Sequence, residues 1–186
     1  MTVAGVILAG GPGTRFAGDR PKLLALLRGK PLVVWAVEPA LEAGLDEVVV
    51  VTGAADLRDV VPDEVTLLQN EIWDQGQATT LRVGLDWCAR RGHDAAVIAL
   101  GDQPYLLASA WKAVAAAEGT PIAVATYAGR RGHPVRLAAD VWPIMPVNGD
   151  AGARAVISQR PELVSEVPCD GNPRDIDTLE DLRRWS

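Results

Sequence analysis

The stretch VAGVILAGGPGTR, residues 3–15, places an apolar run directly before a cluster of glycines. Residues 3–9 are apolar or glycine throughout, which is typical of a β-strand buried on both faces of a parallel sheet. Glycines 10, 11 and 13 lack a Cβ, so their backbone N–H groups can approach a phosphate closely. The stretch therefore predicts a buried first strand followed by an anion-binding turn.

Strand-like apolar runs and helix-like stretches alternate along the rest of the chain. The predicted strands lie at 47–52, 94–100, 122–126 and, as a return strand, 132–135. The predicted helices lie at 31–43, 77–91, 106–118 and 150–159. A short strand at 175–178 should precede a C-terminal helix capped by Thr178 or Asp177. This rhythm predicts an α/β fold with a mostly parallel sheet, in which ligands bind at the carboxyl ends of the strands.

Length and charge narrow the class of protein. The 186 residues fit a single domain over 1–186, and 18 Lys and Arg against 24 Asp and Glu give a net charge of −6. This acidic balance argues against nucleic-acid and membrane partners. The longest uncharged stretch, 1–14, is too short for a spanning helix and lacks the basic start of a signal peptide. Together with two distant cysteines, Cys88 and Cys169, these features predict a cytoplasmic protein.

The glycine cluster is neither of the two best-known phosphate loops. A dinucleotide motif would need glycine where Phe16 stands, and a Walker A motif would need Lys-Ser or Lys-Thr where Asp19-Arg20 stand. A turn that merely ends the strand is the plain alternative. Arg15 and Lys22 favour a phosphate site, because their positive charges can neutralise phosphate oxygens next to the loop.

Carboxylates at predicted strand ends indicate a divalent-cation site. Asp102 follows the strand at 94–100, where a carboxylate can bind a cation that in turn holds substrate phosphates. Asp175 and Asp177 stand two apart on a predicted strand and should point the same way, so that one or both can meet Asp102. Helix capping is the alternative for Asp175 and Asp177, and helix capping or a turn aspartate is the alternative for Asp102. Asp150 either caps its helix or holds a second substrate.

In order along the chain, these pieces resemble the MobA-like nucleotidyltransferases and, within them, the molybdenum cofactor cytidylyltransferase (MocA) type. Six segments carry this resemblance. Each is weak evidence when taken alone, but all six occur in the family's order between residues 6 and 182. They are Leu8-Ala-Gly-Gly-x-Gly-Thr-Arg15 with Lys22, Asn70-x-x-Trp73-x-x-Gly76-Gln77-x-x-Thr80-Leu81, Gly101-Asp-Gln-Pro104, Gly132-His-Pro-Val135, Gly149-Asp-x-Gly-x-Arg154 and Asp175-Ile-Asp-Thr-x-Glu-Asp-Leu182.

The resemblance implies a Rossmann-like three-layer α/β/α fold, with a nucleotide-binding half at about 1–105 and an acceptor-binding half at about 106–186. It implies catalytic roles for Arg15, Lys22 and Asp102, and Mg²⁺ or Mn²⁺ held by Asp102 and Asp177, with Asp175 as second choice. The implied nucleotide-binding residues are Leu8, Ala9, Gly10, Gly11, Gly13, Thr14, Arg15, Lys22, Asn70, Gly76 and Thr80. The implied acceptor-binding residues are His133, Asp150 and Arg154, although His133 taken alone is better interpreted as structural.

The leading functional hypothesis is transfer of CMP from CTP to the phosphate of a molybdopterin-type cofactor, with release of pyrophosphate. Guanylyl transfer to that cofactor, or nucleotidyl transfer to another phosphorylated small molecule, are close alternatives. A non-catalytic module that holds the cofactor for a molybdoenzyme is an alternative of a different class. The full set of Arg15, Lys22, Asp102 and Asp177 favours catalysis, because a binding-only protein could lose the metal carboxylates.

Overall fold

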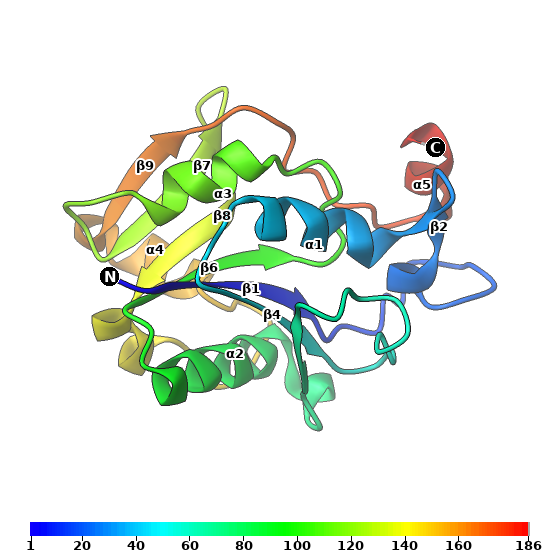
Figure 1. Cartoon of the computed structure of the whole chain (residues 1–186), viewed down its shortest axis with the longest axis horizontal. Helices are drawn as coiled ribbons and strands as arrows, with labels where there is room; N and C mark the ends of the chain where they lie inside the picture. The colour runs from blue at the N-terminus through cyan, green and yellow to red at the C-terminus, as the bar shows by residue number, and fades with distance from the viewer. Residues whose placement is uncertain (186) are drawn as a thin grey trace.

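A computed structural model describes residues 1–185 and contains one seven-stranded sheet in the order β5-β4-β1-β6-β8-β7-β9 (Figure 1). Its strands are β1 (Val3–Ala9), β4 (Glu47–Thr52), β5 (Thr66–Gln69), β6 (Ala95–Leu100), β7 (Ile122–Tyr127), β8 (Arg130–Ala138) and β9 (Val164–Pro168). Strand β8 runs antiparallel to both neighbours, and the other pairs of this sheet are parallel. The predicted mostly parallel sheet is confirmed.

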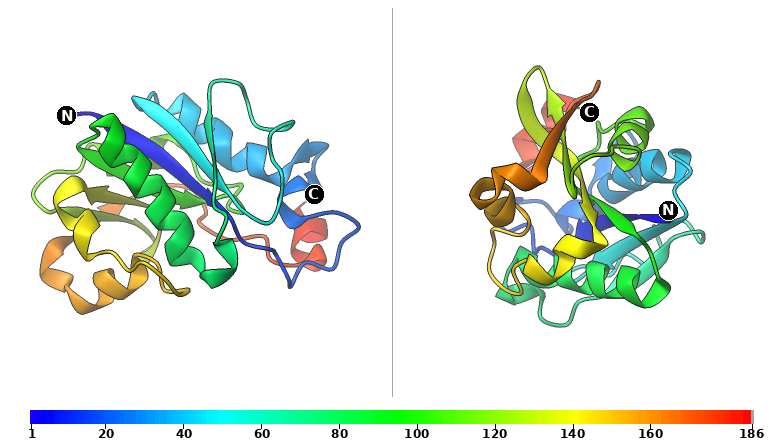
Figure 2. Two further views of the ribbon diagram at one scale, coloured as in Figure 1. Left: turned by 90° about the horizontal axis from the view of Figure 1, so that it is seen from below. Right: turned by 90° about the vertical axis from the view of Figure 1, so that its left-hand side faces the viewer.

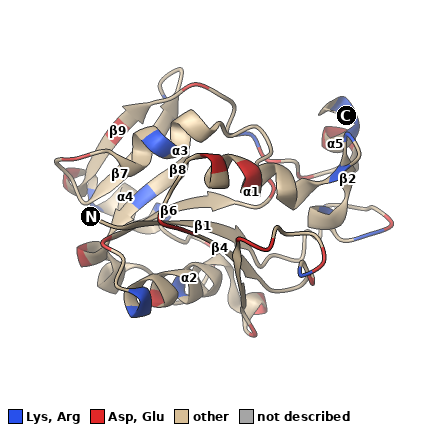
Figure 3. Ribbon diagram, viewed as in Figure 1, with Lys and Arg blue, Asp and Glu red and all other residues tan. Residues whose placement is uncertain are grey.

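Helices cover both faces of the sheet (Figure 2). Helices α1 (Leu32–Glu42) and α3 (Ala108–Ala115) pack on one face, and α2 (Gln77–Arg91) and α4 (Arg154–Gln159) pack on the other. Alternate residues of β1 pack on opposite faces of the sheet. Ile7 packs in the apolar layer on the α1 side, and Val6 packs in the layer on the α2 side. The central strands β1 and β6 carry no charged residue (Figure 3), as burial on both faces requires. No described helix combines the length and the apolar character needed to span a bilayer.

Two predicted helices begin later than expected. Strand-like pairing of Leu106 with Gly171 holds the chain extended before α3, which therefore starts at Ala108. Helix α4 starts at Arg154 rather than at residue 150, because Gly149 accepts a 2.9 Å hydrogen bond from the Ala78 backbone N–H and packs on the start of α2. Asp150 therefore does not cap the helix that the sequence assigned to it.

The predicted strand at 175–178 is wrong, because this segment has no strand partner. The backbone N–H of Ile176 donates one 3.0 Å hydrogen bond to the Asp102 carbonyl, and no ladder follows. The predicted C-terminal helix is confirmed as α5 (Leu179–Trp185). Its cap is Thr178, whose Oγ1 accepts a 3.1 Å hydrogen bond from the Asp181 N–H.

A small hairpin connects the glycine loop to α1. It consists of a 3-10 turn (Lys22–Leu24) and the strands β2 (Leu26–Leu27) and β3 (Lys30–Pro31). Arg28 and Gly29 between these strands both have positive φ, 49° and 79°, as the tightest hairpin turns require. In addition to the apolar layers on the two faces of the sheet, a third apolar cluster packs this region against the C-terminal segment. Its buried members are Phe16, Ala25, Leu27, Leu32, Ile176 and Leu182. The cluster fixes Lys22 close to residues 175–177.

A partly buried polar cluster lies at the end of the sheet opposite the glycine loop. The Glu47 carboxylate accepts hydrogen bonds from Thr66 Oγ1 at 2.8 Å and Trp87 Nε1 at 3.0 Å, and contacts His93 Nε2 at 2.9 Å. The Arg91 guanidinium lies 3.5 Å from the same carboxylate. His93 thus serves the structure, joining the end of α2 to β4.

This cluster should make stability depend on pH. Burial favours the neutral form of Glu47, but hydrogen bonds from His93, Trp87 and Thr66 outweigh it and hold the pKa of Glu47 below its ordinary 4.5. The stabilisation is therefore present above that value and is lost as the pH falls through the folded-state pKa. We expect Glu47→Gln to unfold about 1–3 kcal/mol more easily in urea at about pH 7, and the difference to shrink at about pH 3. An equal difference at both pH values would contradict this assignment.

Candidate active site

Three chain segments meet beyond the carboxyl ends of β1 and β6. They are the glycine loop (residues 10–16) after β1, the acidic turn (residues 101–104) after β6, and a strap (residues 171–178) that leads into α5. The strap contacts the acidic turn through the Ile176 hydrogen bond to Asp102. This is the edge of the sheet at which the sequence predicted a ligand site.

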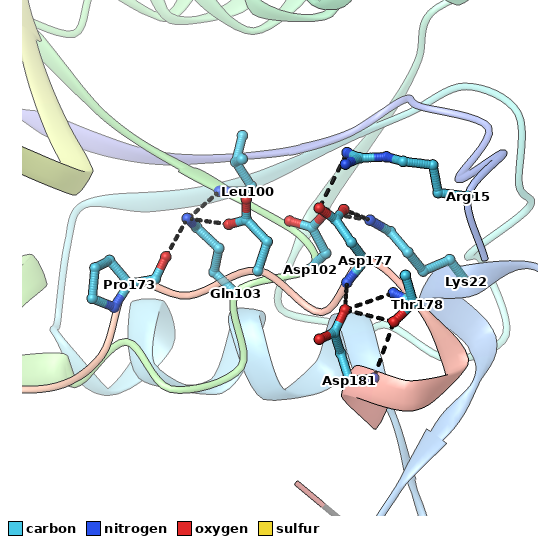
Figure 4. Close-up of polar contacts among 10 residues, drawn as sticks. Arg15, Lys22, Leu100, Asp102, Gln103, Pro173, Asp177, Thr178 and Asp181 are labelled. Atoms are coloured by element: carbon cyan, nitrogen blue, oxygen red, sulfur yellow. Dashed lines mark hydrogen bonds and ion pairs between the residues drawn. The ribbon is translucent and has the colours of Figure 1, made fainter. Parts of the chain in front are cut away.

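Lys22 is the centre of a charged cluster at this meeting point (Figure 4). Its Nζ lies 2.5 Å from Asp102 Oδ2 and 3.2 Å from Asp177 Oδ1, and Arg15 Nη2 lies 3.1 Å from Asp177 Oδ2. The Lys22 side chain is only 12% exposed, whereas that of Arg15 is 75% exposed. Lys22 is thus held in place before substrate arrives, and Arg15 remains free to turn toward one.

The carboxylates around Lys22 keep it charged. Burial alone would lower the pKa of Lys22, but the neighbouring Asp102 and Asp177 outweigh burial and raise it. Asp175 lies near the same carboxylates, and burial, with the charges of Asp102 and Asp177, raises its pKa to about 6. The site therefore offers a fixed cation between carboxylates, which suits chemistry on phosphates.

Asp102 and Asp177 fit a divalent cation. Asp102 Oδ1 is buried and, among the described residues, has no hydrogen-bond partner, although such an acceptor is normally satisfied. Carboxylate oxygens are the ligands that Mg²⁺ and Mn²⁺ prefer. No group of three or more His, Cys, Asp or Glu within residues 1–185 forms a ready-made metal site. Substrate oxygens and water would complete the coordination, as is usual for Mg²⁺ on phosphates.

A cavity of about 500 Å³ opens between the glycine loop and the start of α2. Of the predicted site residues it is lined by Leu8, Gly10, Gly11, Thr14, Gly76, Thr80, Asp102 and Asp150. Predicted nucleotide-binding residues that do not line it are Ala9, Gly13, Arg15, Lys22 and Asn70. The Asn70 side chain is buried and donates to Thr79 and Thr80 Oγ1 at 2.9 and 3.0 Å, so it holds the start of α2 instead of facing the cavity.

Gly10 is required by the close approach of α2 to the loop. A Cβ at Gly10 would collide with Thr80 Oγ1, whereas a Cβ at Gly11 would meet nothing within 4 Å. We expect Gly10→Ala to lower the free energy of unfolding by about 1–3 kcal/mol and Gly11→Ala to change it by less than about 1 kcal/mol, as measured by urea denaturation. Equal destabilisation by the two variants would contradict this packing argument.

A second cavity, of about 430 Å³, adjoins the first and shares Leu8, Gln77 and Leu100 with it. Its wall includes the predicted acceptor residues His133 and Arg154. The structure places the third predicted acceptor residue, Asp150, in the first cavity instead. Two adjoining cavities of this size can hold two small substrates side by side.

His133 is a neutral wall residue of the second cavity. Burial, assisted by the positive charge of Arg154, lowers the pKa of His133 to about 4. Its backbone carbonyl accepts a 2.7 Å hydrogen bond from the Tyr127 hydroxyl, which ties this part of β8 to the end of β7. A neutral imidazole leaves the positive charge of this wall to Arg154 and Arg131, and Arg131 is already paired with Glu166.

Trp73, Gln77 and Gln103 are among the cavity-lining residues for which the sequence predicted no role. Trp73 and Gln77 line the first cavity, and Gln103 lines the second. Trp73 and Gln77 stand inside one of the segments that carry the family resemblance. The resemblance therefore identified this segment as functional but assigned no role to either residue. Gln103 stands beside Asp102 in the acidic turn, and its uncharged side chain carries no signal of a site in the sequence.

The model of the MobA-like NTP transferase domain matches residues 5–164. The chain belongs to the MobA-like NTP transferase family. It is 33% identical to Nicotine blue oxidoreductase of Paenarthrobacter nicotinovorans over 98% of this chain and 95% of that protein. As a member of this family it is a nucleotidyltransferase, with a nucleoside triphosphate and a small-molecule acceptor as substrates.

Solved structures of similar chains share the fold. Rv0371c from Mycobacterium tuberculosis H37Rv is 29% identical with a TM-score of 0.85, over 99% of this chain and 96% of that one. Its complex with manganese matches with a TM-score of 0.82 at 28% identity, over 100% and 98% of the two chains. A nucleotidyl transferase from Methanothermobacter thermautotroptrophicus has a TM-score of 0.84 at 23% identity, over 98% and 95%, and so supports the fold alone.

Proposed function

We propose that this protein transfers a nucleoside monophosphate, CMP from CTP in the first place, to the phosphate of a molybdopterin-type cofactor. The observation that carries the proposal is the Lys22 cluster, with Asp102 and Asp177, beside two adjoining cavities. The acidic turn Gly101-Asp-Gln-Pro104 and the segment Asp175-Ile-Asp-Thr178 resemble the cytidylyl type, which favours CTP and this acceptor.

In the reaction, an oxygen of the acceptor phosphate attacks the α-phosphorus of the triphosphate. A new P–O bond forms as the bond to the bridging oxygen of the β-phosphate breaks, and pyrophosphate leaves. Such a transfer needs positioning and charge neutralisation rather than a covalent enzyme intermediate. Backbone N–H groups of the glycine loop and the exposed Arg15 hold the triphosphate, while Lys22 stabilises charge on the transferred phosphoryl group.

A divalent cation held by Asp102 and Asp177 would neutralise phosphate oxygens of both substrates. Mg²⁺ and Mn²⁺ both suit these ligands, and a manganese complex of the similar Rv0371c chain supports the choice. Arg154, in the second cavity, is the cation that would hold the anionic part of the acceptor. Delivery of the product to a molybdoenzyme, and a cytoplasmic location, stay predictions.

Pyrophosphate release tests the proposal. With Mg²⁺ and molybdopterin-type cofactor, release from CTP but not from GTP, ATP or UTP, abolished in Asp102→Ala, is the expected result. Release from GTP instead would keep the reaction and change the nucleotide, and release only with another phosphorylated acceptor would change the second substrate. If a folded protein that binds nucleotide released no pyrophosphate from any triphosphate, the result would favour the cofactor-holding module. Turnover of nicotine blue by such a silent protein would favour an oxidoreductase like its relative.

A further inference from the structure

Gln103 fastens the first half of the strap to the acidic turn. Its side chain is 3% exposed, and its Oε1 accepts a 3.2 Å hydrogen bond from the Leu100 N–H. Its Nε2 donates to the Pro173 carbonyl at 2.9 Å and to Asp175 Oδ1 at 2.7 Å (Figure 4). One amide group therefore joins the end of β6 to two points of a segment 70 residues later.

Asp181 fastens the second half of the strap to α5. Its Oδ2 accepts hydrogen bonds from the backbone N–H of Asp177 at 3.2 Å and of Thr178 at 2.9 Å, and from Thr178 Oγ1 at 2.8 Å. Thr178 Oγ1 in turn accepts from the Asp181 N–H. This is a reciprocal capping arrangement at the start of α5, with Asp181 in the place usually taken by Glu.

Between these two attachments the strap backbone has little freedom. Ile176 is fully buried in the third apolar cluster, and its N–H bonds to the Asp102 carbonyl at 3.0 Å. The next side chain, Asp177, is thereby directed at Lys22 and Arg15. Asp175, two residues earlier, accepts its hydrogen bond from Gln103 instead.

We infer that Gln103 and Asp181 are positioning residues that hold the strap so that Asp177 reaches the Lys22 cluster. No hydrogen bond or ion pair among the described residues joins either one to Lys22 or Arg15, so both act through the strap. Gln103 has a second effect, because it lines the second cavity together with Pro173 and Asp175. The inference rests on the proposed function for its kinetic consequence, but its structural consequence does not.

The kinetic consequence differs between the two residues. Loss of the Gln103 amide should raise KM for the acceptor and lower kcat, with little change in KM for the triphosphate. Loss of the Asp181 carboxylate should lower kcat and leave both KM values near wild type, because Asp181 lines neither cavity. For Gln103, a merely structural role would instead reduce the active fraction and leave every KM unchanged. For Asp181, strap cleavage and metal binding make this distinction.

Two readouts need no turnover. Arg174 is exposed within the strap, so trypsin cleavage after Arg174 reports how often the strap loosens. Mn²⁺ binding followed by electron paramagnetic resonance reports whether Asp177 is in place beside Asp102. In Gln103→Leu and Asp181→Asn we expect faster cleavage at Arg174 and about 10–100-fold weaker Mn²⁺ binding. The matched controls Gln159→Leu and Glu180→Gln change exposed side chains outside the strap, and both should leave the two readouts at wild-type values.

Two further variants guard against simple misfolding. Gln103→Asn keeps the amide but shortens its reach, and should reproduce the loss in a protein that folds. Gln103→Glu combined with Asp175→Asn exchanges donor and acceptor, and should recover part of the Mn²⁺ affinity lost in Gln103→Glu alone. Wild-type cleavage and Mn²⁺ affinity in folded Gln103→Leu and Asp181→Asn would overturn the inference. Absence of nucleotidyl transfer by the wild-type protein would overturn the proposed function and leave these two readouts decisive for the strap.

Discussion

Asp102→Asn is expected to lower kcat for pyrophosphate release by about 10³-fold or more, while the protein stays folded. The change keeps the shape of the side chain and removes the charge that Lys22 and a divalent cation would share. Lys22 keeps its 3.2 Å contact with Asp177, so its ammonium is not left without a partner. Loss of Asp102 also relieves its repulsion of Asp175. We therefore expect the melting temperature to change little while turnover disappears.

The control for Asp102 is an exposed aspartate outside the site. Asp140 lies in the 3-10 segment after β8 and lines neither cavity. Asp140→Asn should keep wild-type kcat and melting temperature. Full activity in Asp102→Asn would mean that the Lys22 cluster is not where the reaction takes place, and the second cavity would then have to supply another centre.

The strands that position this site could be predicted from sequence because they are buried on both faces. Strands β1, β4 and β6 consist almost wholly of apolar residues, and Asp102 was found because it follows one of them. Edge strands β5 and β9 were missed, because their half-exposed residues such as Thr66 and Glu166 break the apolar run. Pairing with a neighbour, which the sequence does not display, decides the structure there.

The strap was mispredicted for a related reason. The alternation of polar and apolar residues in Asp175-Ile176-Asp177 is typical of a strand. The segment forms one backbone hydrogen bond, from Ile176 to Asp102, instead of a strand ladder. The two carboxylates consequently have different partners. Asp175 accepts a hydrogen bond from Gln103, whereas Asp177 forms ion pairs with Lys22 and Arg15. Such a division depends on contacts between residues far apart in the chain. Only the family resemblance, and no local pattern, preferred Asp177 over Asp175.

Lys22→Ala should separate turnover from metal binding, because its effects on the two have opposite signs. The ammonium of Lys22 supplies positive charge to the phosphates, so its loss should lower kcat by about 10²–10³-fold. In the free protein the same ammonium is paired with the carboxylates of Asp102 and Asp177. Without it three neighbouring carboxylates repel one another, and a divalent cation no longer has to displace Lys22 from two of them.

We therefore expect Lys22→Ala to bind Mn²⁺ more tightly than wild type, and Mn²⁺ to raise the melting temperature of the variant more than that of wild type. Lys30→Ala is the matched control, since Lys30 pairs with Glu38 over the Trp35 ring and belongs to neither cavity. An equal loss of kcat in Lys30→Ala would show that the effect is general. Weaker Mn²⁺ binding in Lys22→Ala would mean that Lys22 orders the two carboxylates for the cation, so that the ammonium and the metal cooperate instead of competing for one position.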